Sequence, residues 1–268
     1  MKTLFGFIGA GNMGGALAKA VSSSVSGENV LISDKDSAKA SALALEIKAK
    51  TEDSAEVAEK AKFIFLGVKP QVMAVALEEI LPALKSRTDR FVLVSMAAAV
   101  SIEKIKEMTD KSFPVIRIMP NTPVSIGKGV ILYDASEEVE TAEIAEFEAA
   151  LSGAGLLSAL PEKLIDAGSV VSGCGPAFVY LFGEALADAG VECGLPREAA
   201  LKFAAATLSG AGELLLTSGK HPGELKDAVC SPGGTTIEGV HSLEASGFRG
   251  AVMDAVRAAF EKTKKLSK

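Results

Sequence analysis

The chain has 268 residues, with 28 lysines and arginines against 34 aspartates and glutamates, and its net charge of −6 argues against nucleic-acid binding, which needs a basic surface. Its three cysteines are scattered without a CxxC pair, which excludes a disulfide scaffold and a zinc ribbon, predicts no metal site and suits a reducing compartment. Because the N-terminus lacks a signal peptide's apolar stretch and no run reaches the roughly 18 apolar residues of a membrane helix, we expect a cytoplasmic protein without membrane contact.

Up to about residue 160, short apolar runs alternate with helical patterns. The runs cover residues 4–8, 30–33, 63–68, 91–95, 115–119 and 130–133. Each is nearly all apolar rather than alternating, which is typical of strands that helices cover on both faces. Strand–helix–strand units of this length predict right-handed crossovers, so we expect residues 1–160 to form a doubly wound α/β domain with a mostly parallel sheet.

From residue 161 to 268 the strand signals stop, and the sequence predicts an all-α domain. Residues 176–218 and 236–266 are rich in Ala, Leu, Glu and Lys at helical spacing. Segments such as Ala177–Phe182 carry apolar residues around much of the helix circumference. Such a helix is either buried against the first domain or part of a dimer interface, and we favour the interface.

A glycine-rich segment with the pattern GxGxxG, from Gly9 to Gly14, follows the first predicted strand and opens a helix predicted over residues 15–21. Gly9 permits a tight turn, Gly11 lets the backbone approach a pyrophosphate, and Gly14 lets the helix pack closely on the strand. Asp34 ends the next strand, twenty residues after Gly14, where an acid that binds ribose is expected. Together these features predict a dinucleotide site.

The choice of dinucleotide stays open at this point. Asp34 favours NAD because its carboxylate accepts hydrogen bonds from ribose hydroxyls and repels a 2′-phosphate. Lys35 and Lys39 lie nearby, where they either contact that phosphate or belong to a solvated loop. Both NADPH and NADH are therefore candidate cofactors.

Three further strand ends carry small or polar residues: Val68–Pro70, Ser95–Ala99 and Met119–Pro123. Ligands of doubly wound sheets bind outside the carboxyl ends of the strands, so we expect these loops to line the nicotinamide half of the cleft. The alternative is structural, because two prolines alone explain a rigid turn around Asn121, and Lys69 is equally explained as a surface lysine.

A second motif, residues 227–238, joins two predicted helices through a proline–glycine turn. Thr235 and Glu238 have the spacing of a capping box, which predicts Thr235 as the helix N-cap and leaves the Thr236 hydroxyl free for a ligand. The amides of Gly234, Thr235 and Thr236 would then form an anion site. A well-capped interhelical loop is the alternative explanation.

The helical half lacks an obvious proton donor. Between Lys163 and Lys202 there is no lysine and no histidine, and we interpret His221 and His241 as surface or core residues. Reduction of a ketone needs an acid for the developing alkoxide, whereas hydride transfer to an iminium only quenches its charge. This absence favours C=N over C=O reduction.

Over its whole length the chain resembles the pyrroline-5-carboxylate reductase family. The resemblance is carried by the GxGNMG segment and by the segments 68–70, 117–123, 173–178, 221–227 and 231–236, the last two containing HPGELKD and SPGGTT. It implies NAD(P)H-dependent reduction of Δ1-pyrroline-5-carboxylate to L-proline, the last step of proline biosynthesis. It also implies a Rossmann domain followed by an all-α dimerisation domain, with dimers that assemble into larger rings, a decamer of dimers among them.

The resemblance also implies roles for individual residues. Together with Asp34 and Lys35, which the sequence pattern described above supplies, the residues expected to bind the cofactor are Gly9, Gly11, Asn12, Met13, Gly14, Val68, Lys69, Pro70, Ala97, Ala98 and Asn121. Those expected to bind the substrate are Ser231, Pro232, Gly233, Gly234, Thr235 and Thr236. Thr236 is the expected catalytic residue, through a hydrogen bond to the ring nitrogen, and the dimer would bring this loop to the partner's cleft.

The sequence departs from the family pattern at three positions. Ala99 stands where the family usually has glycine and Cys174 where serine is common, and both exchanges are small enough to be tolerated. Asp34 puts the family's frequent use of NADPH in doubt. Two other functions remain as alternatives, a hydroxyacid dehydrogenase of similar architecture and a non-catalytic dinucleotide sensor.

Overall fold

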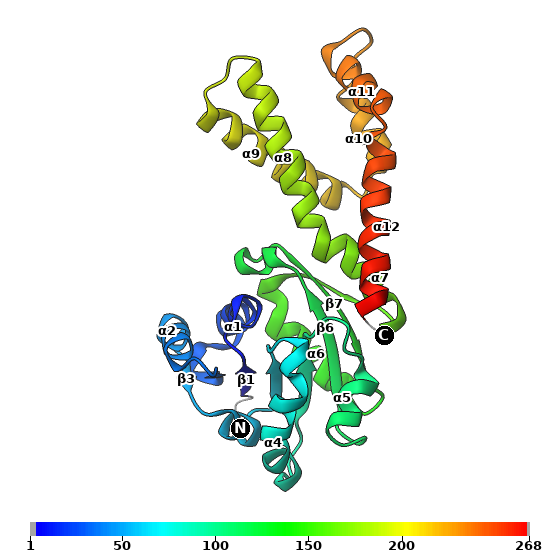
Figure 1. The fold of residues 1–268 in the computed structure, drawn as a ribbon. Coiled ribbons are helices and arrows are strands. Elements are labelled where there is room, and N and C mark those ends of the chain that lie inside the picture. The colour runs from blue at the N-terminus through cyan, green and yellow to red at the C-terminus, as the bar shows by residue number, and fades with distance from the viewer. Residues whose placement is uncertain (1–3, 267–268) are drawn as a thin grey trace. The chain divides into compact units, whose positions relative to one another are not determined.

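A computed structural model describes residues 4–266, which divide into two units. The first unit runs up to Gly173 and includes the chain from Lys262 onward; the second covers Cys174–Glu261. Figure 1 labels many of the elements of both units. The division falls thirteen residues after the predicted boundary at 160, and the boundary between the functional domains stays a prediction.

The first unit is built on one eight-stranded sheet with the order β3-β2-β1-β4-β5-β6-β7-β8. Its strands are β1 (Phe5–Ile8), β2 (Val30–Ser33), β3 (Lys50–Thr51), β4 (Phe63–Leu66), β5 (Val92–Ser95), β6 (Val115–Pro120), β7 (Gly129–Ala135) and β8 (Gly155–Ala159). All neighbours pair in parallel except β6 and β7. The predicted Rossmann-type, mostly parallel sheet is confirmed, and the two outer strands β3 and β8 were not predicted.

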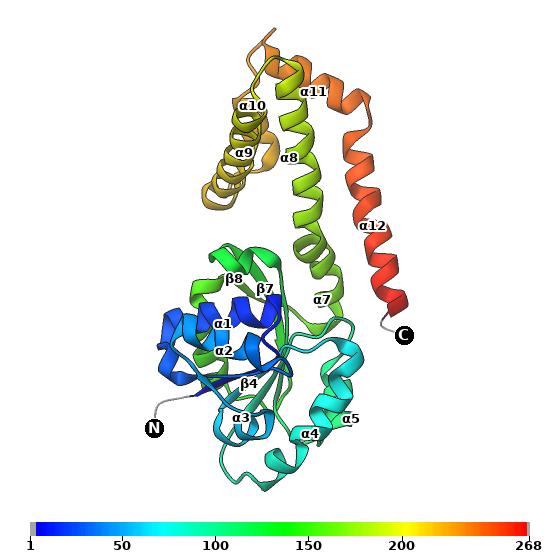
Figure 2. The same ribbon diagram turned by 60° about the vertical axis from the view of Figure 1, so that its left-hand side comes forward.

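Helices cover the sheet on both faces, with α1 and α2 on the side opposite α3, α4 and α5 (Figure 2). The helices of this unit are α1 (Asn12–Val25), α2 (Ser37–Ile47), α3 (Ser54–Lys60), α4 (Met73–Ser86), α5 (Ile102–Met108), α6 (Thr141–Leu151) and α7 (Glu162–Ser169). Short 3₁₀ turns cover Gly27–Asn29, Pro70–Val72, Thr122–Ile126 and Ser152–Ala154.

Two apolar cores fill the space between sheet and helices. Phe7 and Phe65 stack on one face with ring centroids 4.4 Å apart, among residues of α1, α2 and α6. Ile64 and Leu66 point to the other face and pack with α3, α4 and α5. Because successive side chains of a strand face opposite sides, apolar residues at every position serve both cores.

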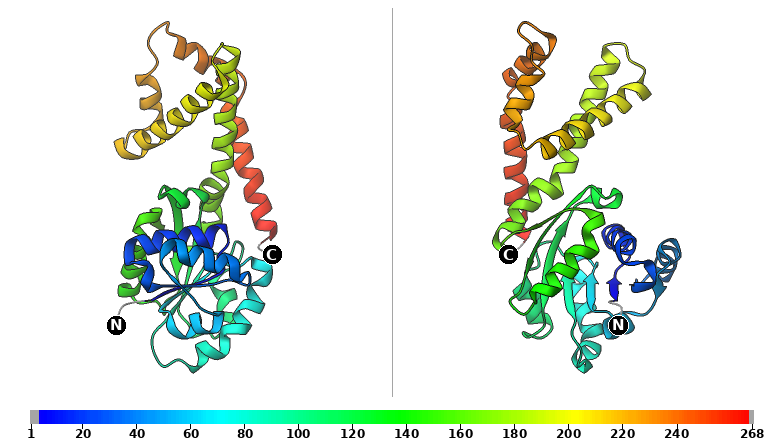
Figure 3. Two further views of the ribbon diagram at one scale, coloured as in Figure 1. Left: turned by 90° about the vertical axis from the view of Figure 1, so that its left-hand side faces the viewer. Right: turned by 180° about the vertical axis from the view of Figure 1, so that it is seen from behind.

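The second unit is entirely helical (Figure 3). A π-helical segment, Val170–Cys174, leads from α7 into α8 (Gly175–Glu192), and the chain continues with α9 (Arg197–Ser218), α10 (Pro222–Ala228), α11 (Thr235–Ala245) and α12 (Phe248–Leu266). The predicted breaks at 194–196, 219 and 231–234 are confirmed as the ends of these helices.

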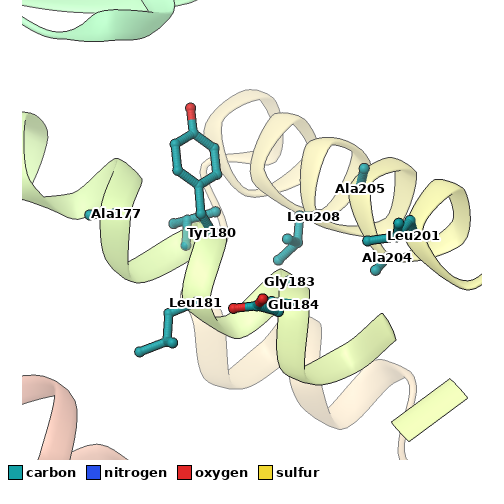
Figure 4. A pocket seen from close by; sticks show the side chains of 10 residues that line it. Ala177, Tyr180, Leu181, Gly183, Glu184, Leu201, Ala204, Ala205 and Leu208 are labelled. Carbon is teal, nitrogen blue, oxygen red and sulfur yellow. The ribbon is translucent and has the colours of Figure 1, made fainter. Parts of the chain in front are cut away.

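Helices α8 and α9 pack on each other and leave much of their apolar surface exposed. Leu208 of α9 points toward α8, where a Cβ on Gly183 would lie 2.8 Å from its Cδ1 atom (Figure 4). Around this contact lies an open pocket of about 740 Å³. The large apolar side chains exposed on the two helices are Val179, Tyr180, Leu181, Leu186, Leu201, Phe203, Leu214, Leu215 and Leu216.

By length and composition alone, the helical stretches Glu162–Glu192 and Arg197–Ser218 could cross a membrane. Long apolar helices of other proteins pass the same test, so the criterion is weak. The expectation of no membrane contact therefore stays a prediction.

Candidate active site

The glycine-rich segment lies where the strand order reverses. β1 has β2 on one side and β4 on the other, so the loop after β1 occupies the point at which ligands of doubly wound sheets bind. The strand ends are level, because Ile8 pairs with both Ser33 and Leu66. The Gly9 N–H donates to the Ser33 carbonyl over 2.8 Å, which fixes the turn at the end of β1.

Three glycines meet at this turn and bring α1 close to the sheet. Gly9 has a φ of 107°, and a Cβ there would lie 2.7 Å from the Gly67 backbone. A Cβ on Gly14 would lie 2.1 Å from the Gly9 carbonyl oxygen. The predicted reasons for Gly9 and Gly14 agree with this geometry. The sequence analysis missed Gly67, which directly follows β4. The available signal was a glycine at the end of a strand, which often marks a close approach of another backbone.

The loop leaves room for a ligand at Gly11. Gly11 is the N-cap of α1, and a Cβ placed on it would have no heavy atom within 4 Å. No side chain caps this helix and its first turn has no acidic residue, so its first N–H groups are available to an anion. The residues therefore fit the pyrophosphate of a dinucleotide. Asn12 and Met13 form the first turn, and the helix begins three residues before the predicted start at residue 15.

Asp34 directly follows β2 and contacts the glycine-rich loop. Its Oδ2 accepts a hydrogen bond from the Ala10 N–H over 2.6 Å, and its Oδ1 accepts one from the Asp36 N–H over 2.9 Å. Lys35 is exposed, and the Lys39 Nζ lies 3.7 Å from Asp36 Oδ2. The structure thus brings the predicted ribose acid to the predicted loop.

The loops after β4 and β5 lie at the same edge of the sheet, since both strands run parallel to β1. Val68 is half-buried, and the exposed Lys69 and Pro70 begin the 3₁₀ turn that leads into α4. Ala97 is buried and Ala98 is exposed. These residues stand where the nicotinamide half of the cofactor is expected.

Asn121 is 7% exposed and uses both ends of its amide within the protein. Its Oδ1 accepts from the Val130 N–H over 2.8 Å, and its Nδ2 donates to the Ser172 carbonyl, also over 2.8 Å. The side chain therefore links the end of β6 to β7 and to the π-helical segment. Its predicted contact with the cofactor stays a prediction.

A buried arginine, also missed as a functional candidate, anchors the helix that precedes this segment. Arg117 on β6 is 4% exposed and donates to Glu162 Oε1 over 3.2 Å and to Asp166 Oδ1 over 2.7 Å, both on α7. Glu162 also accepts from the Ile102 N–H, over 2.7 Å. A single apolar strand containing one arginine was the available signal, because a buried guanidinium requires carboxylate partners.

The second motif lies in the second unit, between α10 and α11. Ser231, Pro232 and Gly233 are exposed, Gly233 has a φ of 68°, and the Gly234 N–H donates to the Ser231 carbonyl over 3.0 Å. Helix α11 begins at Thr235, and its N-cap is Gly234 with no side-chain hydrogen bond.

The predicted capping box of Thr235 and Glu238 is therefore wrong. Gly234 has the extended conformation of an N-cap, with φ −83° and ψ 170°, so each threonine lies one position further into the helix than predicted. Thr235 and Thr236 are the first two helical residues, and both are exposed. The consequence for ligand binding is favourable, because no side chain occupies the N–H groups of this helix start.

His221 caps α10, where its Nδ1 accepts from the Gly223 N–H over 3.1 Å. This role agrees with its interpretation as a surface residue. Among residues 4–266, no group of three or more His, Cys, Asp and Glu side chains could hold a metal ion.

Comparisons with known proteins cover the same two parts of the chain. The family model "NADP oxidoreductase coenzyme F420-dependent" matches residues 4–99, and the model "Pyrroline-5-carboxylate reductase dimerisation" matches residues 162–266. Pyrroline-5-carboxylate reductase 3 of Danio rerio is 41% identical over 263 residues, covering 97% of this chain and 90% of that protein. The Escherichia coli pyrroline-5-carboxylate reductase is 38% identical over 271 residues and all of both chains.

Solved structures agree. The Plasmodium falciparum pyrroline carboxylate reductase with NADP bound has a TM-score of 0.86 and 33% identity, and the Coxiella burnetii pyrroline-5-carboxylate reductase has a TM-score of 0.92 and 28% identity, each covering all of both chains. The predicted resemblance, fold class and use of a nicotinamide dinucleotide are confirmed. The chain belongs to the pyrroline-5-carboxylate reductase family of NAD(P)-dependent oxidoreductases.

Proposed function

We propose how this chain carries out the reduction of Δ1-pyrroline-5-carboxylate to L-proline, the last step of proline biosynthesis. The observation that carries the proposal is the turn of Gly9, Gly14 and Gly67, which seats the start of α1 against the sheet and leaves Gly11 open. The α1 N–H groups, with Asn12 and Met13, hold the cofactor pyrophosphate. Lys69, Pro70, Ala97 and Ala98 border the nicotinamide, with Asn121 behind them.

The start of α11 binds the substrate carboxylate. Gly233 and Gly234 keep the loop small, and the first N–H groups of the helix carry no side-chain cap. Unpartnered N–H groups at a helix start attract an anion, which suits the carboxylate of a small cyclic imino acid. Ser231 and Pro232 hold the loop in shape, and the Thr235 backbone contributes one of the amides.

Bound NADH or NADPH supplies the hydride that is transferred to C5 of the imine. The chain's own residues provide positioning and a polar environment for a zwitterionic substrate. Thr236 is exposed at the start of α11, and its hydroxyl forms a hydrogen bond with the ring nitrogen and orients it. No strong acid is needed, because hydride transfer to an iminium quenches its charge.

The chain self-associates through its dimerisation domain, and we assign this contact to the apolar faces of α8 and α9. Nine large apolar side chains are exposed on these two helices, and an apolar surface of this size is typical of a protein–protein interface. A second copy of the same helices covers it symmetrically. In the dimer, the loop 231–236 completes the partner's cleft. Assembly beyond the dimer, such as the larger rings of the family, would be measured by sedimentation.

We place the domain boundary after residue 160, between the part that binds the cofactor and the part that dimerises and binds the substrate. This boundary is supported by the dimerisation model, which begins at residue 162, although Glu162–Gly173 groups with the first unit of the structure. The reaction needs only soluble reactants, so a cytoplasmic location without membrane contact agrees with it.

The experiment follows the oxidation of NADH and NADPH by absorbance with DL-pyrroline-5-carboxylate as substrate. Thr236→Ala is expected to lower kcat/KM about ten-fold or more, the range of one lost positioning hydrogen bond, with an unchanged Kd for the cofactor. Thr235→Ala is the matched control, because only the backbone amide of Thr235 has a proposed role and the substitution leaves that amide in place. Equal kinetics for the wild type and Thr236→Ala would refute this role. Turnover of 3-hydroxy acids instead would support the dehydrogenase alternative.

A further inference from the structure

We propose that this chain prefers NADH to NADPH and that Asp34 sets the preference. The inference rests on the proposed cofactor site and assigns its adenosine end, which the family membership leaves open. Three observations carry it: the way the Asp34 carboxylate is held, the charge of the pocket that it lines, and the position of the neighbouring lysines.

The Asp34 carboxylate is fixed beside the loop that takes the pyrophosphate. The Ala10 N–H, 2.6 Å from Oδ2, belongs to that loop, and the Asp36 N–H, 2.9 Å from Oδ1, holds the second oxygen. Two backbone donors keep the side chain from turning toward solvent. Each carboxylate oxygen has two acceptor sites, so one on each remains for a ribose hydroxyl. A fixed carboxylate with free acceptor sites matches the 2′- and 3′-hydroxyls of NADH.

Asp34 also lines a pocket of about 310 Å³ whose charge is negative. Three other carboxylates line it, those of Glu52, Asp53 and Glu56, and no lysine or arginine of the described chain does. Lys60 offsets part of this charge from outside the lining, with its Nζ 2.9 Å from Glu52 and 3.4 Å from Glu56. Asp34 makes no ion pair within residues 4–266. The pocket therefore stays negative after Lys60 is counted.

A 2′-phosphate would enter this pocket with a charge of about −1.5 to −2. The hydrogen bond from Lys60 lowers the pKa of Glu52, so this carboxylate, like an ordinary glutamate, is charged at neutral pH. A like charge opposite the phosphate disfavours NADPH, whereas the ribose hydroxyls of NADH gain an acceptor. Both effects act in the same direction.

The neighbouring lysines do not reverse this balance. Lys39 lies 3.7 Å from Asp36, a partner of its own, and its side chain is 65% exposed. Lys35 is exposed, and neither lysine lines the pocket. An exposed lysine attracts a phosphate only weakly because water and salt screen the interaction.

The test measures equilibrium binding to the full-length protein, by the fluorescence of NADH and NADPH and by calorimetry with 5′-ADP and 2′,5′-ADP. We expect the wild type to bind NADH about ten-fold or more tightly than NADPH, since one charge-assisted hydrogen bond is worth about that factor. The two adenosine diphosphates should differ in the same direction, because they contain the discriminating half of the cofactor. Added salt should narrow the gap as the repulsion is screened.

Asp34→Asn tests the residue with its shape retained. We expect weaker NADH binding, tighter NADPH binding and a ratio of the two Kd values that moves toward one. Asp36→Asn is the matched control, because it makes the same change of charge two residues away, keeps a good helix N-cap and does not line the pocket. Its ratio of Kd values should equal that of the wild type. A melting temperature equal to that of the wild type would show that each variant is folded.

Equal or tighter binding of NADPH by the wild type would overturn the inference, and so would an unchanged ratio in Asp34→Asn. A loss of NADPH binding in Lys35→Ala alone would assign the choice to the lysine instead. Each of these results changes only which nucleotide is preferred, and a protein that still binds a nicotinamide dinucleotide keeps the proposed function. Binding of neither nucleotide would overturn both.

Discussion

The two units differ in how they bury their apolar residues. In the first, strands such as β1 and β4 are fully buried between two layers of helices, and the cores on both faces are closed. In the second, the buried core comprises only Ala187, Ala200 and Ala204, while leucines and a phenylalanine of α9 are exposed. The first unit closes its cores within one chain, whereas the exposed apolar faces of the second agree with the dimerisation family model that matches residues 162–266. In the proposed mechanism, cofactor binding therefore needs one chain, whereas substrate reduction needs two.

The largest effect is expected from a charge on the exposed face of the second unit. Leu181 on α8 is 68% exposed in the single chain, and Leu181→Asp would place a carboxylate in the proposed dimer interface. An unpaired charge buried there costs about 3 kcal/mol or more, enough to weaken association at least about 100-fold. Sedimentation should detect monomers, and kcat/KM should fall with the dimer fraction because the proposed site uses residues of both chains.

Leu45→Asp is the matched control for this experiment. Leu45 lies on α2 of the first unit and is 84% exposed, so the same substitution meets only water. Association and activity should stay at the wild-type level. A dimeric and fully active Leu181→Asp variant would contradict the assignment of this face.

The second expected effect concerns Ala99 in the first unit, where the family usually has glycine. Ala99, after β5, has a φ of 62°, which is the left-handed region that disfavours alanine by about 1–2 kcal/mol. Ala99→Gly removes this strain but makes the unfolded chain more flexible, at a cost of about 0.4–1 kcal/mol. We expect a net stabilisation of about 0.5–1 kcal/mol by urea denaturation.

Ala98→Gly separates the conformational effect from the loss of a methyl group. Ala98 is not among the residues with positive φ, so the substitution brings only the entropic cost. It should therefore destabilise the protein. Destabilisation by Ala99→Gly of the same size would show that position 99 has no special backbone requirement.

The sequence predicted the central strands better than the borders of the sheet. Almost entirely apolar runs mark β1, β2, β4 and β5, because burial on both faces favours apolar residues at nearly every position. β3 has only two residues, Lys50 and Thr51, both exposed, and offers no such signal. The antiparallel direction of β7 could have been predicted, since residues 121–128 are too few for a parallel crossover of about a dozen residues.

The candidate site could be predicted where the backbone conformation requires one residue type. It could be predicted less well where the role of a residue depends on contacts with other elements. Gly9 and Gly14 follow from a turn that any dinucleotide loop needs. The N-cap of α11 was misplaced by one residue because Thr235 and Gly234 both suit that position, and only the conformation of the preceding turn selects the glycine. The pairing of Asn121 with Val130 and Ser172 depends on elements far apart in the sequence, which periodicity does not report.

The smallest effect is a pH dependence confined to the first unit. Glu138, before α6, accepts a hydrogen bond from Lys106 of α5 over 2.6 Å. This bond, with a further one from Ser136, lowers the pKa of Glu138 from 4.5 to about 2 in the folded protein. Because the folded pKa is depressed, the pair stabilises the protein above pH 4.5, and this stabilisation is lost as the pH falls toward 2.

Glu138→Gln should remove this contribution, which stays below about 1 kcal/mol because the pair is partly exposed to water. The free energies of unfolding of the wild type and the variant should differ at pH 6, and this difference should shrink below pH 4.5 and vanish near pH 2. Glu137→Gln is the matched control, since Glu137 is exposed and makes no ion pair within residues 4–266; its difference from the wild type should be independent of pH. A difference for Glu138→Gln that persists at low pH would assign its role to packing, because protonation of the carboxylate would then leave the stabilising contact intact.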